Sequence, residues 1–372
     1  MLPLVPLLLC CAAQAAQDTV ILQPDAVILE DGSLQPGAVV LVKRDRVLAA
    51  GLSVPQPAGA ALLRVRGVLA PGFVDAFTRL GLADDANESS AAVTPQLLCA
   101  DSVDTEDPVW QRLLEHGITA VHLVPPPVDM GPGGNYSVNV AAGWSALAAT
   151  GGGERVTDPR ARQVFSLHEA PGGGALASAG PTSLPGVLEV LNRAVEAGVP
   201  GLVERGALFQ VESAAAVRAA SSLAQKYGCK STWIVRGDPG SFGGELAGEV
   251  VGVPVLAEGS WQWRTPENWR RLHAAGVRIA FGSDAAGPDW NAFDALRTSA
   301  MALSRASGDP KAALAAVTGN AAALAGQSRE RGRIGAGARA DLVLWSGHPL
   351  DASSRVLAVM VGGRTVYTAQ QP

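Results

Sequence analysis

The chain has 372 residues, of which 48% are hydrophobic and 17% are charged, and its formal net charge at pH 7 is −5. A chain of this size and composition can bury a large core, and at about 150 residues per domain it fits two domains or one barrel with an appendage. The negative charge, with no Lys/Arg-rich stripe in the sequence, excludes the basic surface that nucleic acids and anionic lipids bind.

Residues 1–16 form an apolar run that ends in small residues, Ala13-Gln14-Ala15. This pattern is typical of a secretory signal peptide, although a Lys or Arg is missing at its start. The run is shorter than the roughly 20 apolar residues of a membrane-spanning helix. The alternative, a buried N-terminal strand, fits Pro3 and Pro6 poorly. We therefore expect the chain to be exported to the periplasm or cell envelope after removal of residues 1–16.

The number of cysteines is compatible with export but is too small for a disulfide framework. Cys10 and Cys11 would leave with the signal peptide, so the mature chain keeps Cys99 and Cys229. Two cysteines allow one disulfide in an oxidising compartment. Because the chain has no C-x-x-C pair, zinc-ribbon and thioredoxin-type motifs are excluded.

Both ends of the remaining chain are rich in short β-branched runs separated by turn residues. Asp31-Gly32 lies between apolar runs near the N-terminus, and Gly362-Gly363 does so near the C-terminus. We expect the two ends to pair into one small β-sandwich domain. Its predicted segments are residues 17–68 and 330–372.

The middle of the chain alternates apolar strands with amphipathic helices. Many of the predicted helices end at a glycine, which suits the position after a helix C-terminus. The predicted strands are residues 68–77, 118–126, 161–170, 207–213, 231–237, 253–259 and 277–285. The predicted helices are residues 108–117, 184–198, 213–228, 265–276 and 291–308.

This alternation predicts an α/β fold, a TIM-like (β/α)8 barrel over residues 69–329. Fewer than eight strands are clear, and the weakest region is residues 145–150. Glycine- and proline-rich residues 125–134 and 171–185 are expected to form long loops at the carboxyl ends of the strands, where barrel sites are built.

Three segments resemble the amidohydrolase superfamily and, within it, the imidazolonepropionase-like group. The first is residues 68–75 (VLAPGFVD), and the second is residues 279–284 (IAFGSD). The third has the parts 316–322 (AVTGNAA), 333–335 (RIG), 340–345 (ADLVLW), 347–350 (GHPL) and 361–367 (VGGRTVY). The resemblance extends over essentially all of the chain after residue 16 and implies a barrel with a split β-domain.

The resemblance also implies metal-assisted hydrolysis of a non-peptide C–N bond. In that chemistry the metal lowers the pKa of a bound water from 15.7 to about 7. The family supplies its first two ligands from a His-x-His motif after the first strand, where alternation directs both imidazoles to one face. The matching positions here are Phe77-Thr78-Arg79. Phe77 has no lone pair for a metal, and Arg79 is permanently cationic and has no acceptor.

The other expected ligand positions have changed as well. Where the family places a lysine after strand four, this chain has His168 and Glu169. The histidine of strand five would fall near Gln210 and Glu212, and that of strand six near Arg236. We therefore expect the inherited metal site to be lost. No cofactor is expected, and a divalent metal such as zinc would need a rebuilt site.

Asp284 alone keeps its expected context, as the aspartate at the end of strand eight. Two unit positive charges about 4 Å apart repel by roughly 4 kcal/mol at an effective dielectric of 20, and a divalent cation doubles that. We hypothesise that Arg79 or Arg236 pairs with Asp284 and replaces the charge of the metal. The alternative roles for Asp284 are an N-cap or an ordinary buried ion-pair partner.

The remaining histidines and two tryptophans have mostly structural interpretations. His116 and His273 lie in the last turns of predicted helices, where the macrodipole favours them, and His348 lies in a turn. His122 is on the second barrel strand, facing either the barrel interior or the helices. Trp261 and Trp263 alternate after strand seven and either wall a ligand site or pack on the next helix.

Three functions remain open from the sequence. The favoured one is a degenerate amidohydrolase that keeps a small-molecule pocket or a scaffold role. The alternative is an active hydrolase that acts on a cyclic amide or dipeptide-like substrate through a rebuilt site. A third is a non-catalytic subunit, either of a homo-oligomer or beside a paralogous active subunit. Asp284 is the remnant catalytic residue, and the candidate pocket residues are Phe77, Arg79, His122, His168, Glu169, Gln210, Glu212 and Arg236.

Overall fold

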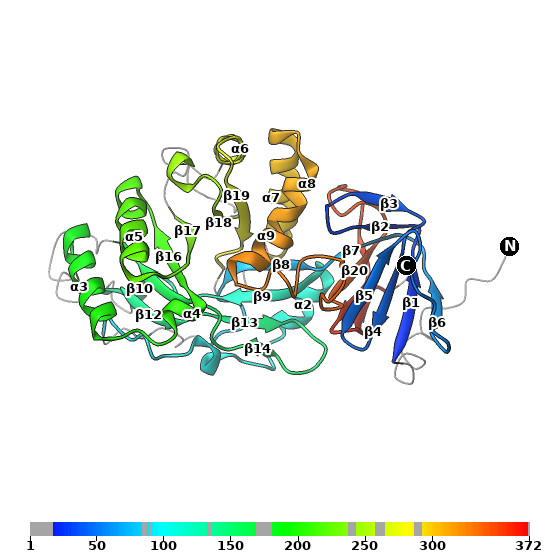
Figure 1. Ribbon diagram of the computed structural model, residues 1–372, viewed down its shortest axis with the longest axis horizontal. Helices are drawn as coiled ribbons and strands as arrows, with labels where there is room; N and C mark the ends of the chain where they lie inside the picture. The colour runs from blue at the N-terminus through cyan, green and yellow to red at the C-terminus, as the bar shows by residue number, and fades with distance from the viewer. Residues whose placement is uncertain are drawn as a thin grey trace.

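The computed structural model describes residues 18–83, 88, 91–131, 135–168, 181–236, 243–256, 265–285 and 292–370. The predicted signal segment, residues 1–16, lies outside these ranges, and so do Glu169, Trp261 and Trp263. Figure 1 shows two parts: packed β-sheets that contain both chain ends, and an α/β part built from the middle of the chain.

Two sheets make up the first part. One contains β1 (Thr19–Gln23), β4 (Val39–Lys43), β5 (Arg46–Gly51) and β6 (Ala61–Arg64) in the order β5-β4-β1-β6. The other contains β2 (Ala26–Ile28), β3 (Leu34–Pro36), β7 (Val68–Pro71), β20 (Leu342–Trp345), β21 (Val356–Val361) and β22 (Arg364–Thr368). Its order is β22-β21-β20-β7-β2-β3, so strands from both chain ends share one sheet, as predicted.

Alternating apolar side chains hold these sheets together. Val20 and Val40 of one sheet and Val27, Leu69 and Leu342 of the other belong to one buried cluster. In a strand, successive side chains point to opposite faces, so each sheet presents one apolar face to the other. The predicted turns are also present between β2 and β3 and between β21 and β22.

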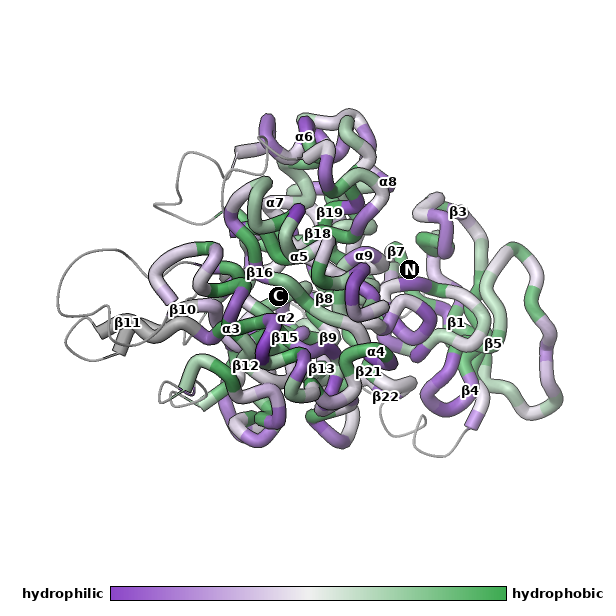
Figure 2. The backbone as a smooth tube through the Cα atoms, turned by 60° about the vertical axis from the view of Figure 1, so that its left-hand side comes forward, coloured by the Kyte–Doolittle hydropathy of each residue, from purple (hydrophilic) through white to green (hydrophobic). Residues whose placement is uncertain are grey.

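The α/β part contains a longer series of strands. They are β8 (Phe73–Thr78), β9 (Ile118–Leu123), β10 (Val128–Gly131), β11 (Asn135–Val138), β12 (Ala141–Trp144), β13 (Ala146–Ala149), β14 (Val156–Asp158), β15 (Gln163–Ser166), β16 (Ala207–Val211), β17 (Ser231–Val235), β18 (Val250–Pro254) and β19 (Arg278–Gly282). β15 to β19 pair in parallel in chain order, and β8 pairs in parallel with β9. Figure 2 shows hydrophobic residues concentrated along β8, β16, β18 and β19.

Two regions differ from the predicted pattern. Residues 145–150 were expected to be a weak strand, but β12 and β13 run antiparallel to β15 and β9, with Ser145 between them. No helix separates β12 from β13. This short run of mostly small residues shows neither the two-residue period of a strand nor the 3.6-residue period of a helix clearly. Residues 125–134 were expected to be a loop, but β10 and β11 form an antiparallel pair there. The predicted strand at residues 253–259 begins earlier, at Val250.

The helices of the described residues are α2 (Val109–Glu115), α3 (Leu184–Ala197), α4 (Leu202–Arg205), α5 (Ala214–Tyr227), α6 (Pro266–Ala274), α7 (Ala292–Ser307), α8 (Pro310–Ala316) and α9 (Gly319–Leu324), with 3-10 helices η1 (Cys99–Ser102) and η4 (Gly243–Leu246). The five predicted helices are present as α2, α3, α5, α6 and α7, whereas α4, α8 and α9 were not among the predicted ranges. Ser183, Ser213 and Thr265 cap α3, α5 and α6 by accepting backbone N–H groups. None of the described helices is long and apolar enough to cross a bilayer.

The two larger sheets of the α/β part meet beside β8 and β19. The Arg79 backbone N–H donates to the Ala285 carbonyl over 2.9 Å, and the Asp284 N–H donates to the Phe77 carbonyl over 3.1 Å. The inner side chains of several strands form a buried cluster with Phe77 and with α9. The chain therefore has a mixed α/β fold in which the ends of β8, β16, β17 and β19 converge.

Candidate functional site

Strand alternation determines which side chains meet at the converging strand ends. Leu208 on β16 and Ile234 on β17 belong to the inner cluster around Phe77. Two residues farther along, Gln210 and Arg236 extend from the same faces.

Arg236 is the centre of this group. One Nη1 N–H forms an ion pair with Asp284 Oδ2, and Nε–H donates to Gln210 Oε1 over 3.1 Å. The guanidinium carbon lies 5.6 Å from the centroid of the Phe77 ring. The side chains of Arg236 and Asp284 are 17% and 15% exposed, so water reaches both. Of the two pairings hypothesised from the sequence, the one with Arg236 is present.

Two neighbouring glycines make room for the Phe77 ring. A Cβ at Gly282 would lie 2.3 Å from a ring atom, and one at Gly252 would lie 3.0 Å from another. Both distances are shorter than a normal van der Waals contact, so a side chain at either position would displace the ring. Phe77 therefore fills the buried space between β8, β18 and β19 instead of offering a ligand atom.

Gln210 connects the cluster to the segment after β9. Its Nε2 donates to the Pro125 carbonyl over 2.9 Å while its Oε1 accepts from Arg236. Both ends of the amide are therefore used, and the side chain is fully buried.

Asp284 has an unusual backbone. Its φ angle is +53°, in the left-handed region that few non-glycine residues adopt. Aspartate tolerates this region better than most residues, and the strain is of a kind that often marks functional sites. Its carboxylate forms an ion pair with Arg236, which matches the ion-pair alternative; residues 286–291, which an N-cap would serve, lie outside the described ranges.

His168 lies at the edge of the cluster. Its Nδ1 is 3.2 Å from Ser166 Oγ, and its Nε2 is 3.6 Å from Glu212 Oε2. Burial, reinforced by the charge of Arg236, lowers the pKa of His168 to about 3, although Asp284 opposes the shift. The imidazole is therefore neutral at pH 7, and its contact with Glu212 is not a full ion pair. Its predicted neighbour Glu169 lies outside the described residues.

Both ring nitrogens of His122 are bonded within the protein. Nδ1 is 2.9 Å from the Ala76 carbonyl, which can only accept, so Nδ1 carries the proton. Nε2 then accepts from the Ser145 hydroxyl over 2.8 Å. Burial lowers the pKa of His122 to about 3. This fully buried ring, bonded at both nitrogens, connects β8 and β9 to Ser145 between β12 and β13.

Asp75, which was not among the residues predicted for the site, lies beside Ser283 below the cluster. Its Oδ1 accepts from the Ser283 N–H over 2.9 Å, and among the described residues its Oδ2 has no partner. Burial raises the pKa of Asp75 to about 7. The motif VLAPGFVD contained the residue, but its complete burial depends on β19 packing against β8.

The donor set at the strand ends does not suit a divalent cation. The Asp284 carboxylate is occupied by a guanidinium, Phe77 offers a ring, and both ends of the Gln210 amide are bonded within the protein. Across the described ranges, no three His, Cys, Asp or Glu side chains lie close enough together to hold a metal. The family's metal therefore has no matching ligand set in this part of the chain.

The other predicted histidines and cysteines have structural positions. His116 ends α2, with Nδ1 2.9 Å from the Arg112 carbonyl, which confirms its capping role. His273 lies in the last turn of α6, and His348 Nδ1 accepts from Leu350 N–H within a turn. Cys99 and Cys229 are both free thiols.

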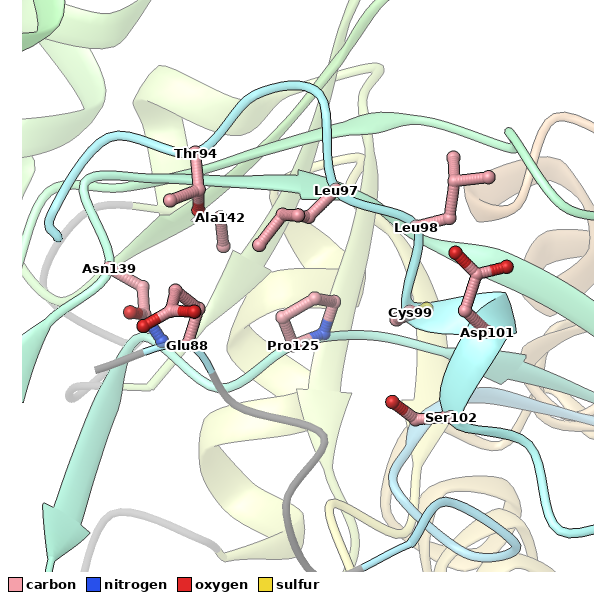
Figure 3. Close-up of a pocket in the computed structure, with 10 residues that line it drawn as sticks. All are labelled: Glu88, Thr94, Leu97, Leu98, Cys99, Asp101, Ser102, Pro125, Asn139 and Ala142. Atoms are coloured by element: carbon pink, nitrogen blue, oxygen red, sulfur yellow. The ribbon is translucent and has the colours of Figure 1, made fainter. Parts of the chain in front are cut away.

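A pocket of about 210 Å³ lies beside Pro125, outside the Arg236 cluster (Figure 3). Its walls come from the segment after β8, from η1 and from the start of β12. None of the candidate residues from the sequence lines it.

Comparison with known proteins shows the family to which the chain belongs. The model of the amidohydrolase family matches residues 176–367, slightly more than half of the chain. No curated protein sequence matches the chain.

Solved structures share the fold at low sequence identity. An amidohydrolase from Thermotoga maritima is 22% identical with a TM-score of 0.78, covering 94% of this chain and all of its own. A prolidase complexed with N-methylphosphonate-L-proline is 17% identical with a TM-score of 0.57 and the same coverage. Phenylurea hydrolase B is 15% identical with a TM-score of 0.61, covering 94% of this chain and 96% of its own. With the family match, the conclusion is plain: the chain belongs to the amidohydrolase family.

Proposed function

We propose that this protein is a degenerate amidohydrolase in which an arginine–aspartate pair has replaced the catalytic metal, leaving a binding or scaffold role. The observation that carries the proposal is the ion pair between Arg236 and Asp284. A guanidinium there already balances the aspartate. A divalent cation entering beside it would meet a repulsion of roughly 8 kcal/mol at 4 Å and an effective dielectric of 20.

The strand order supports a closed barrel with one irregular position. The strand order β8-β9 is followed by β13, which runs antiparallel to β9, and by β12, which runs antiparallel to β15; β15 to β19 come next, and β19 returns to β8. Eight strand positions result if β12 and β13 count as one. In such a barrel, residues at the carboxyl ends of the strands build the site, which is where Gln210, Arg236 and Asp284 lie.

Residues 17–68 and 330–372 are proposed as the β-sandwich domain and residues 69–329 as the barrel. The composition of residues 1–16 supports export to the periplasm or cell envelope after their removal. Export would leave Cys99 and Cys229 in an oxidising compartment as separate thiols.

The alternative is a hydrolase with a rebuilt, metal-independent site. His168 beside Glu212 is the observation that favours it, since a histidine–carboxylate pair is a common general-base unit. The named activities of the prolidase and of phenylurea hydrolase B would suggest cleavage of a C–N bond. Against this, a histidine with a pKa of about 3 is a weak base at neutral pH.

Elemental analysis after equilibration with zinc, manganese and iron tests the proposal. The purified chain without residues 1–16 is desalted and analysed beside its Asp284→Ala variant. We expect far less than one metal per chain in both proteins, and no hydrolysis of a panel of cyclic amides and dipeptides. Stoichiometric metal that is lost in Asp284→Ala would overturn the degenerate assignment. Metal-free hydrolysis that is lost in His168→Ala would favour the alternative.

A further inference from the structure

The last strand of the packed β-sheets carries a bulge. β22 pairs with β21 with a shift of register between Val359 and Met360, so Val366 is an extra residue in β22. In a bulge two residues oppose one residue of the partner strand. Val366 and Tyr367 both pack against the largest buried cluster, which extends into the α/β part. The residues on either side of these two face the space between the two sheets.

Two threonines occupy this face of β22. Thr365 is paired with Met360 and Thr368 with Ala358, and both of these partners belong to the apolar cluster between the sheets. Residues paired in register share a face of the sheet. A threonine side chain is smaller than the leucine and methionine side chains that fill this cluster elsewhere. The end of β22 therefore leaves space that the core does not fill.

A cavity of about 60 Å³ lies at this place, with Leu22 and Leu63 of one sheet facing Leu344 and Met360 of the other. Apart from the two threonines its wall is apolar, and none of the described residues that line it is charged. About 10–15 Å³ is enough for one water, so the cavity can hold several heavy atoms. A bound water needs about two to four polar partners, and this wall offers few. A hydrocarbon group therefore suits the cavity better than water or an ion.

The cavity has a closed end and an open end. Leu69 and Leu342, in its wall, are 4% and 1% exposed and close it on the inner side. Leu63 and Val65 are half-buried and Thr368 is exposed. β6 and β22 are the end strands of their sheets, so the cavity opens at the sheet edges. A molecule can therefore place an apolar end inside while its polar end stays in water.

We propose that this cavity binds the end of an unbranched alkyl chain, which enters between the edges of β6 and β22. The buried carbons contact Leu63 and Met360, and the polar head of the ligand remains outside, beside Thr368. The volume limits the buried part to a few carbons. The proposal goes beyond the loss of the metal, since none of the lining residues belongs to the Arg236 cluster.

NMR titration of the methyl-labelled protein with the primary alcohols from 1-propanol to 1-octanol tests this. We expect saturable shifts of the methyl signals of Leu63 and Met360. The Kd should fall about threefold to fourfold with each added methylene and then level off before 1-octanol, when the cavity is full. Adsorption to an open apolar surface would instead strengthen through the whole series. 1,5-Pentanediol should give no saturable shift, because its second hydroxyl would be buried without a partner.

A matched pair of variants locates the binding. Ala358→Val adds two carbons to the wall at a strand position that suits a β-branched residue, and should raise the Kd for 1-pentanol about tenfold or more without lowering the Tm. Ala49→Val makes the same change on β5, in a separate apolar cluster, and should leave the Kd unchanged. Shifts that do not saturate, affinity that rises through 1-octanol, equal binding of the diol, or a wild-type Kd in Ala358→Val would overturn the proposal.

Discussion

Two arginine–aspartate pairs in this protein differ in their surroundings. Arg331 pairs with Asp341, and their side chains are 2% and 3% exposed. Arg236 pairs with Asp284, and their side chains are several times more exposed. The first pair lies where the β-sheets meet the α/β part, and the second lies where the ends of β17 and β19 converge.

The partners of each pair explain this difference. Arg331 also donates to Thr157 Oγ1 over 3.2 Å, and Asp341 Oδ1 accepts from the Gly362 N–H over 2.8 Å. A charge enclosed in this way stabilises one arrangement of the chain. Arg236, in contrast, retains water contact and lies against an aspartate with a positive φ angle. The same type of ion pair is therefore enclosed by protein at one place and accessible to water at the other.

Removing Arg331 should have the largest effect on stability. Arg331→Met removes the buried partner of Asp341 and leaves only the longer contact with Arg339 Nε, at 3.9 Å; losing one partner of a buried pair typically costs about 3–5 kcal/mol. Thermal unfolding should show a large drop in Tm. The double variant Arg331→Met/Asp341→Asn should recover much of the loss, because the asparagine can still accept from Gly362. A single variant as stable as the wild type would show that burial does not distinguish the two pairs.

The next largest effect on stability should come from His122, and it should be seen as a change in the free energy of unfolding with pH. Its pKa is lowered from 6.5 to about 3, so folding favours the neutral ring. Its stabilising contribution is complete above pH 6.5 and is lost as the pH falls toward 3. Between pH 7.5 and 4.5 the loss is about 3 kcal/mol, at 1.36 kcal/mol per pKa unit. Urea unfolding at both pH values should show this loss in the wild type and not in His122→Gln.

Asp75 changes stability in the opposite direction over a similar pH range. Its pKa is raised from 3.8 to about 7, so its protonated form is favoured in the folded state. Its contribution is complete below pH 3.8 and is lost as the pH rises through 7. Because wild type and His122→Gln share this term, the difference between them isolates His122. An equal pH dependence in both proteins would contradict the neutral assignment of His122.

Arg236→Met should have the smallest effect on stability. Water reaches Asp284, so the loss should be about 1–2 kcal/mol, between the values for exposed and buried pairs. Unfolding of this variant beside Arg331→Met measures the contrast directly. A loss as large as that of Arg331→Met would mean that the Arg236 pair is also mainly structural.

The sequence predicted the parts of the fold that depend on local signals. Ser213 and Gly228 mark the ends of α5 in both sequence and structure, because caps act over a few residues. The antiparallel β12 and β13 were missed, since AAGWSALAA contains neither a clear period of two nor one of 3.6.

The candidate site was predicted in outline and not in detail. The position of Asp284 in its motif led to the pairing with an arginine, but the sequence could not choose between Arg79 and Arg236. That choice depends on β17 lying near β19 and on Gln210 orienting the guanidinium. The burial of Asp75 and the pocket beside Pro125 depend on contacts between segments that are far apart in the chain. No local sequence pattern predicts such contacts.

The number of zinc ions bound per chain tests the central claim most directly. The wild type should be measured beside a Phe77→His/Arg79→His/Arg236→His variant, which returns imidazoles to three expected ligand positions and frees Asp284. The account predicts no stoichiometric zinc in the wild type and a gain of zinc in the variant. One tightly bound zinc per wild-type chain, retained through desalting and lost with Asp284→Ala, would contradict it.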